Sequence, residues 1–291
     1  MAKSKSGGTR SYIRGKIGAD VYSIGKNGKG QKQQVVRSLA EVVSNPQTED
    51  QMRGRMIMST VMQAVSCLAP IIDHSFDNVP NGQPSISEFI RQNYALIKAD
   101  VAAHPSSGNK FGMNKYQEKG PRGGQFVISA GDVIDGGGIL LSGTSSIAVM
   151  EVLLSSTNKT FGFLKERIGI TNDDYLTIVA MGDNGSLRYC RFYPNANVAD
   201  DTVIDTTNVS TLFTQEGNEI FTLAIDGSKV TFTGDAMVTA FGYILSQKTD
   251  GGWKHSKSTM QITLEMTGWT ADVALPTYPQ GSARFLNGGD I

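Results

Sequence analysis

The chain has 291 residues, of which 39% are hydrophobic and 19% charged, and this length can bury a sizeable core in one large domain or two modest ones. Its two cysteines, Cys67 and Cys190, lie far apart and outside any C-x-x-C motif, so neither a zinc framework nor a redox pair is expected, and a reducing compartment is the simpler expectation. The N-terminus leads from lysines into glycine and polar residues, and no stretch approaches the roughly 20 apolar residues of a membrane helix. We therefore expect a soluble protein that has no signal peptide and no membrane partner.

The formal net charge of zero hides a difference between the start of the chain and the rest. Residues 1–37 hold nine lysines and arginines against Asp20 alone, a net charge of +8, so the remainder carries −8. This asymmetry predicts an arm that seeks an anionic surface, either nucleic acid or the acidic body of another copy. Because the two parts balance, stacking of copies is at least as natural as binding to nucleic acid.

The N-terminal arm (residues 1–45) is more than a polar tail. It contains strand-forming residues between Tyr12 and Ile24, a turn sequence at Lys26-Asn27-Gly28-Lys29-Gly30 and a second run from Gln33 to Val36. These features predict an extended segment or a hairpin. An isolated two-stranded hairpin is marginal in water, so it would need a sheet or a partner to lie on.

Two amphipathic helices are expected next. Thr48-Glu49-Asp50-Gln51 forms a capping box, and apolar residues then recur at helical spacing until Pro70. Ser85-Ile86-Ser87-Glu88 repeats the box and opens a second helix that should end before Pro105. Together they predict a helical pair joined by a long connection.

From about Gly124 the pattern changes to short apolar runs separated by glycine and polar turns, which indicates a sandwich or barrel. Asp226-Gly227 is the clearest hairpin signal, and Thr249-Asp250-Gly251-Gly252 marks another. The expected strands are Phe126–Ile128, Ile139–Leu141, Ile147–Leu154, Tyr175–Met181, Leu187–Tyr193, Ile220–Ile225, Val230–Phe232, Val238–Leu245 and Met260–Leu264.

The sequence thus predicts an α+β fold in four parts. These are a basic arm or hairpin (1–45), a helical pair (46–105), a glycine-rich linker or reaching loop (106–124) and a mainly antiparallel β-sandwich or barrel (125–291).

Motifs for catalysis and metal binding are sparse, so we expect neither an enzyme nor a cofactor. The three histidines, His74, His104 and His255, are not spaced as metal ligands and are expected on the surface or in loops. The carboxylate clusters at Asn172-Asp173-Asp174 and Asp200-Asp201 lack the spaced ligands of a calcium loop, so solvated turns are favoured over a structural cation.

Aromatic residues leave two ligand classes open. Tyr12 and Tyr22 lie among basic residues and could stack on bases, but no nucleic-acid-binding module is recognisable, so contact with protein is favoured. Trp253 and Trp269 are possible platform residues of a glycan-binding or glycan-cleaving module, although Trp253 beside a hairpin turn more simply packs across strands.

Two stretches carry a resemblance to a known family. The first runs from Gly15-Lys16-Ile17-Gly18-Ala19-Asp20-Val21-Tyr22 through Val35-Val36-Arg37 to Val43-Ser44-Asn45-Pro46-Gln47-Thr48. The second joins Gly242-Tyr243-Ile244-Leu245-Ser246 to Gly252-Trp253-Lys254-His255-Ser256 and Met260. They resemble the opening and the closing hairpin of a family of unknown function from Bacteroidota and their phages, and together they cover roughly a quarter of the chain.

The resemblance implies a virion structural protein of a tailed, crAss-like Bacteroides phage, assembled in the host bacterial cytoplasm. A ring protein of the neck or tail barrel is preferred, with a capsid auxiliary (decoration) or head-fibre protein as the alternative and a nucleic-acid-binding protein as the second. The expected partners are copies of the chain and other virion proteins. The residues expected to form the assembly arm are Arg10, Tyr12, Arg14, Lys16, Tyr22 and Arg37.

Overall fold

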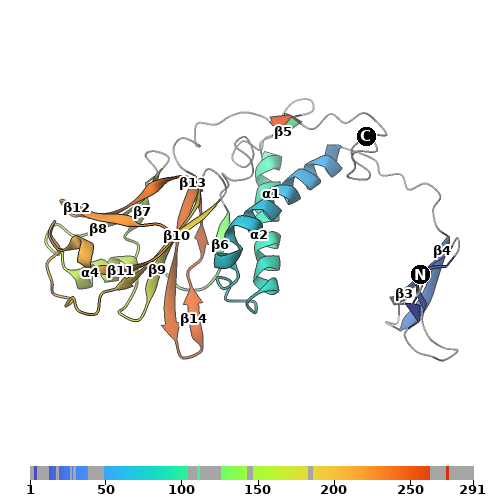
Figure 1. The fold of residues 1–291 in the computed structure, drawn as a ribbon, viewed down its shortest axis with the longest axis horizontal. Helices are drawn as coiled ribbons and strands as arrows, with labels where there is room; N and C mark the ends of the chain where they lie inside the picture. The colour runs from blue at the N-terminus through green and yellow to red at the C-terminus, as the bar shows by residue number, and fades with distance from the viewer. Residues whose placement is uncertain are drawn as a thin grey trace. The chain divides into compact units, whose positions relative to one another are not determined.

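The computed structural model describes residues 3–4, 13–17, 20–26, 28, 31–38, 49–103, 110–111, 126–142, 147–182, 186–262 and 273–274. The chain divides into two compact units (Figure 1). The first contains the N-terminal strands, and the second spans Thr48–Thr277. Each unit is described by itself below.

The N-terminal unit contains a four-stranded antiparallel sheet in the order β1-β2-β3-β4. Its strands are β1 (Lys3–Ser4), β2 (Ile13–Ile17), β3 (Asp20–Lys26) and β4 (Lys32–Ser38). The predicted turn at residues 26–30 lies between β3 and β4, because Lys26 pairs with Lys32. The sequence predicted a hairpin here, and the structure extends that hairpin with β2 and β1.

The second unit begins with two packed helices, α1 (Glu49–Ile72) and α2 (Gln83–Ala103). The first starts directly after Thr48, as the capping box predicts, but it continues two residues past Pro70. The helix α2 starts at Gln83, before the capping box predicted at residues 85–88. Pro84 is suited to this first turn, because backbone N–H groups in the first turn of a helix form no intrahelical bond and proline lacks one. The hydroxyl of Ser85 accordingly donates to the carbonyl of Pro80 and does not cap the helix.

A mainly antiparallel sheet of nine strands forms the rest of this unit, with its main path in the order β11-β10-β9-β13-β8-β7. Its strands include most of the predicted ones, with bounds within a few residues. They are β7 (Ile139–Leu141), β8 (Ile147–Leu153), β9 (Tyr175–Gly182), β10 (Leu187–Pro194), β11 (Phe213–Gly217), β12 (Phe221–Asp226), β13 (Lys229–Thr249), β14 (Gly252–His255) and β16 (Gln261–Ile262). Two short pairs lie beside it: β6 (Val127–Ser129) with β15 (Ser258–Thr259), and β5 (Lys110–Phe111) with β17 (Val273–Ala274).

The long strand β13 joins the two parts of the sheet. Its first half pairs with β12 and β8, and its second half pairs with β9 and β14. The pairing register shifts between Thr233 and Met237, which marks an irregularity in the strand. The sequence predicted two strands here, and the structure corrects this to one. Both predicted hairpins are present, with Gly227 and Gly252 at positive φ in the turns.

The sequence missed a short helix, α4 (Phe161–Ile168), and the strand β11. Thr160 caps the start of α4 through its hydroxyl, which accepts from the N–H of Phe163, and Gly169 ends the helix at φ 92°. A short 3₁₀ turn, η1 (Val209–Thr211), precedes β11.

Two hydrophobic cores lie on opposite faces of β9. Leu176, Ile178 and Ala180 face the first core, where they meet α4 and a cluster of phenylalanines around Phe192. Val179 and Met181 face the second core, which α1 and α2 cover together with β6 (Figure 1). Because β9 is buried on both faces, its sequence is a continuous apolar run without alternation.

Asn93 on α2 ties the helices to the sheet region. Its side-chain oxygen accepts from the N–H of Val127 at 2.8 Å, and its amide donates to the carbonyl oxygens of Val127 and Phe89. These bonds satisfy a buried amide and fix α2 beside β6. The predicted α+β class, with a helical pair and a mainly antiparallel C-terminal sheet, is confirmed.

One described helix would be long and apolar enough to cross a membrane, namely the stretch Arg53–Ile72 of α1. Its length and composition differ from the expectation that no stretch of the chain approaches a membrane helix. A core helix of a soluble protein passes the same test, and Val61, Ala64, Leu68 and Ile72 of α1 are fully buried in the second core.

Candidate functional site

The predicted assembly residues divide between described and undescribed parts of the chain. Arg10 and Tyr12 lie outside the described residues. Arg14 and Lys16 lie on β2, Tyr22 on β3 and Arg37 on β4, so the structure places these four residues in one sheet. Tyr22 is half-buried and Arg37 is exposed.

The backbone register brings positive residues opposite one another in this sheet. Lys3 pairs with Arg14 across β1 and β2, and Lys26 pairs with Lys32 across β3 and β4. The net charge of +8 on residues 1–37 would favour the approach of an acidic surface.

The sheet β1–β4 has no buried residue among those of its residues whose burial the structure describes (15, 20–25, 28 and 31–38). On β4, six of the seven residues are exposed and only Val35 is half-buried. Val36 is 51% exposed, although it is a β-branched apolar residue in the middle of a strand. The described part of this sheet therefore gains little from burial, and a surface to pack on would stabilise it.

A second candidate site lies in the unit 48–277, where an aromatic groove of about 650 Å³ opens beside the sheet. One wall is the connection between α1 and α2 (residues 74–81), and the other is the hairpin of β13 and β14 (residues 251–255). The floor is formed by Tyr175, Arg191 and Tyr193. We call these residues together the aromatic groove.

Three rings follow one another along the aromatic groove. The centroid of Tyr175 lies 5.2 Å from that of Tyr193 and 4.8 Å from that of Trp253. Trp253 is 44% exposed, so part of its ring is open to solvent. Burial and the nearby Glu216 carboxylate raise the pKa of Tyr193, so this ring stays neutral at physiological pH. The prediction that Trp253 packs across strands is confirmed by its contact with Tyr175.

Arg191 lies among these rings. Its guanidinium carbon is 5.8 Å from the ring centre of Tyr175 and 5.6 Å from that of Tyr189, distances at which a cation is attracted to the ring faces. Within the described ranges, the guanidinium has no hydrogen-bond or ion-pair partner. Its five N–H donors are therefore open to a ligand.

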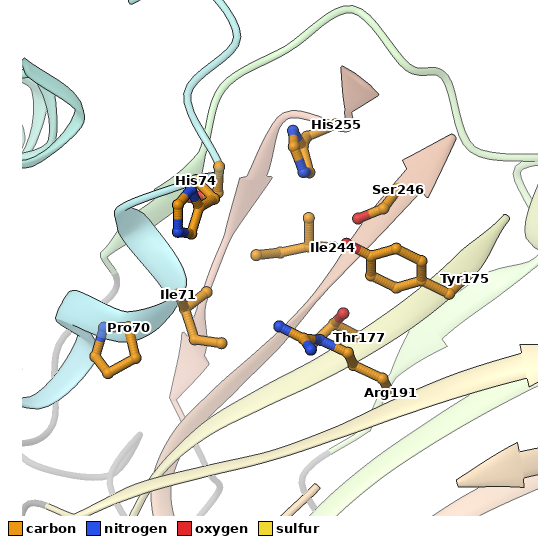
Figure 2. A pocket seen from close by; sticks show the side chains of 10 residues that line it. Pro70, Ile71, His74, Tyr175, Thr177, Arg191, Ile244, Ser246 and His255 are labelled. Carbon is orange, nitrogen blue, oxygen red and sulfur yellow. The ribbon is translucent and has the colours of Figure 1, made fainter. Parts of the chain in front are cut away.

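A smaller cavity of about 40 Å³ shares four lining residues with the groove: His74, Tyr175, Arg191 and His255. Figure 2 shows these side chains around the cavity, with Pro70 and Ile71 coming from the end of α1. A volume of this size holds a water molecule or a small polar group.

The two walls of the groove are fastened by Asp77 and His255. One carboxylate oxygen of Asp77 accepts from the backbone N–H of His255 at 2.8 Å, and the other lies 2.7 Å from the ring Nδ1 of His255. The side chains of His255 and Asp77 are only 10% and 5% exposed. The expectation of a surface or loop position is therefore wrong for His255, while His74 is exposed as predicted. His104 lies outside the described residues.

Glycine at position 131 permits this close arrangement. A side-chain carbon at Gly131 would lie 2.2 Å from both the Asp77 carboxylate and the His255 carbonyl oxygen. In addition, the hydroxyl of Ser75 donates to the carbonyl of Ile128 at 2.6 Å, and the N–H of Asp77 donates to the carbonyl of Ala130. The wall formed by residues 74–81 is thus held to the sheet side of the groove by several bonds.

The two carboxylate clusters meet around a lysine. Lys165 on α4, nearly buried, donates through Nζ to Asn172 and, at 2.6 Å, to Asp200. Asp174 is buried, which differs from the expected solvated turn, and it accepts from the N–H and hydroxyl of Thr171. Among the described residues, no group of three or more histidine, cysteine or acidic residues could hold a metal ion. Lys165 places a positive charge between the two clusters.

Sequence patterns alone did not reveal the aromatic groove. Tyr175 begins β9 and Tyr193 lies near the end of β10, so only the register of that hairpin places their rings together. The hairpin signal at residues 249–252 was recognised, and it does place Trp253 beside the sheet. The Asp77–His255 contact joins residues that are 178 positions apart.

Comparison of the chain with protein-family models, with curated proteins and with solved structures finds no match.

Proposed function

We propose that the chain is a structural component of a tailed-phage virion that assembles as a homo-oligomeric ring of the neck or tail barrel. In this proposal the sheet β1–β4 joins neighbouring copies, and other virion proteins bind the assembled ring. The observation that carries it is the sheet without buried residues among those described. Such a sheet is expected to gain its stability from a partner surface.

The edge strand β4 offers a second means of attachment. Among the described strands it pairs only with β3, so it lies at the edge of the described sheet, where a strand of a partner can be added. A strand of another subunit can pair with such an edge, and the side chains of alternate residues then supply specificity. Val36 and Arg37 on β4 would contribute an apolar contact and a charged one.

The charge distribution supports a partner that is another copy of the chain. The segment 1–37 has a net charge of +8 and the remainder −8, so a basic segment of one subunit complements the body of the next. A heterologous contact of this kind closes into a ring when the rotation between subunits permits it. The phage assignment rests on the two stretches that resemble the Bacteroidota and phage family.

Sedimentation velocity of the full-length chain tests this proposal. The double variant Val36→Asp, Arg37→Glu should convert a closed oligomer into smaller species, because it places negative charge at two adjacent exposed positions of β4, one on each face of the sheet. The matched control is Ile134→Asp, at a residue of the other unit that is 84% exposed. Unchanged sedimentation of the double variant, or a monomeric full-length chain, would refute the proposal.

The alternative proposal is a capsid auxiliary or head-fibre protein, in which the same sheet grips the shell. An image of the whole particle distinguishes the two by the position of the chain. A nucleic-acid-binding role for the basic segment predicts retention of duplex DNA at low salt and a steep loss as salt is raised.

A further inference from the structure

We infer that the aromatic groove is a carbohydrate-binding site, in which a pyranose ring stacks on Trp253 while its hydroxyls bond to Arg191. This inference does not rest on the proposed assembly role, because all of its residues belong to the unit 48–277.

The size and lining of the groove suit a small polar ligand. Its volume of about 650 Å³ falls within the range of roughly 300–1,000 Å³ that is usual for small-molecule sites. The groove combines aromatic rings with a few polar groups, and its lining comes from four separate segments of the chain: residues 74–81, Tyr175, residues 191–193 and residues 251–255. Sites of this composition use the rings for contact area and the polar groups for orientation.

The rings provide the surface on which a sugar would stack. Aromatic faces carry partial negative charge, and the C–H groups on the flat side of a pyranose carry partial positive charge, so the two attract each other. Trp253 is open to solvent over much of its side chain, and Tyr175 and Tyr193 continue the row of rings. Because the planes of Trp253 and Tyr175 are inclined at 66°, one pyranose ring can stack on the face of one of these two rings but not flat on both.

Donors and acceptors for the sugar hydroxyls lie next to the rings. The Arg191 guanidinium is held by the faces of Tyr175 and Tyr189, and no described residue accepts its N–H groups. Asn81 on the facing wall is exposed and can donate and accept at once. The cavity of about 40 Å³ beside Arg191 and His74 can admit a water or a substituent of the ring.

The charges of the groove favour a sugar over nucleic acid. Its lining includes two permanent cations, Arg191 and Lys254, and one carboxylate, Asp77, which already bonds to His255. Binding of a nucleic-acid backbone draws on many cations along a track. A ligand that is neutral or carries one acidic group fits this lining better.

The groove is also preformed. Asp77 and His255 join its two walls through bonds of 2.8 and 2.7 Å, so a ligand need not order these segments when it binds. Affinity is gained when this ordering cost is absent.

The test uses the full-length chain on an array of neutral and uronic-acid oligosaccharides, followed by calorimetric titration of the bound sugars. We expect retention of at least one glycan class, with an affinity that falls at least tenfold in Trp253→Ala and in Arg191→Ala. Trp253→Phe should recover part of the affinity, because it restores an aromatic face. The control is Ile220→Ala, at an exposed residue of the same unit, which should leave binding unchanged.

Intrinsic fluorescence supplies a second measurement. Trp269 is the only other tryptophan of the chain, so the variant Trp269→Phe reports Trp253 alone, and a bound sugar should change its emission. The inference is overturned if no glycan is retained or if Trp253→Ala binds as tightly as the unaltered chain. It is also overturned if oligo(dT) binds in place of sugars with a steep salt dependence. The same variants should leave the sedimentation of the chain unchanged, so the inference and the assembly proposal can fail separately.

Discussion

The buried pair of Asp77 and His255 allows the most exact prediction. The variant Asp77→Ala removes two acceptors at once and leaves the His255 N–H and its ring nitrogen without a partner in a site where both side chains are at most 10% exposed. Hydrogen bonds to charged groups contribute about 1.5–3 kcal/mol each, and an unpaired buried donor adds its own cost, so we expect the loss of two such bonds to destabilise the fold by at least about 3 kcal/mol. For a domain of this size, that corresponds to a fall in Tm of about 6–12 °C.

Asp73→Ala is the matched control, since it removes the same side chain four positions earlier. Asp73 lies 3.5 Å from His74, but the two side chains are 35% and 63% exposed. An exposed pair of this kind contributes roughly 0–1 kcal/mol. Thermal unfolding followed by circular dichroism at pH 7 compares the two variants. Equal Tm values for Asp77→Ala and Asp73→Ala would refute the view that Asp77 fastens the groove.

Three further predictions concern single residues of the same unit. Burial raises the pKa of the Glu219 carboxyl, so the folded form keeps its proton to higher pH than the unfolded form. The protonated Glu219 therefore contributes its stabilisation below about pH 4.5, and this contribution is lost as the pH rises through the folded pKa. Glu219→Gln should raise the Tm at pH 7.5 more than at pH 4. An equal rise in Tm at both pH values would contradict this prediction. Burial raises the pKa of the Cys190 thiol to about 12, so iodoacetamide at pH 8.5 should label it only after unfolding, as measured by mass spectrometry. Both Gly169 and Gly137 have positive φ. A side-chain carbon at Gly169 would lie 2.8 Å from the backbone N of Gly136, whereas one at Gly137 would have no atom within 4 Å. Gly137→Ala should therefore lower the free energy of unfolding in urea by roughly 1–2 kcal/mol, and Gly169→Ala should lower it by more. A larger loss in Gly137→Ala would contradict the described packing around Gly169.

Local signals in the sequence predicted much of the secondary structure. The capping box at residues 48–51 marks the start of α1, and the turns at Asp226-Gly227 and at residues 249–252 mark two hairpins, because these features depend on neighbouring residues only. The helix α4 carries such signals as well, in Thr160 and Gly169, but it has only eight residues and was missed.

Features that depend on distant contacts were not predictable in the same way. The sequence predicts two strands, Val230–Phe232 and Val238–Leu245, yet β13 continues through both with an irregularity, because β8 and β12 pair with its first half. The sequence around His255 predicts a surface or loop position, and only the tertiary fold brings Asp77 to its side chain. The aromatic groove needs four segments of the chain that only the tertiary fold brings together.

The measurement that tests the proposed function most directly is the native mass of the full-length chain compared with that of a chain lacking residues 1–47. Residues 48–277 form a compact unit with two hydrophobic cores, so the shortened chain should fold. Native mass spectrometry should find one defined homo-oligomer for the full-length chain and a folded monomer for the shortened one. A full-length chain that remains monomeric, or a shortened chain that keeps the same oligomeric mass, would contradict assembly through the N-terminal sheet.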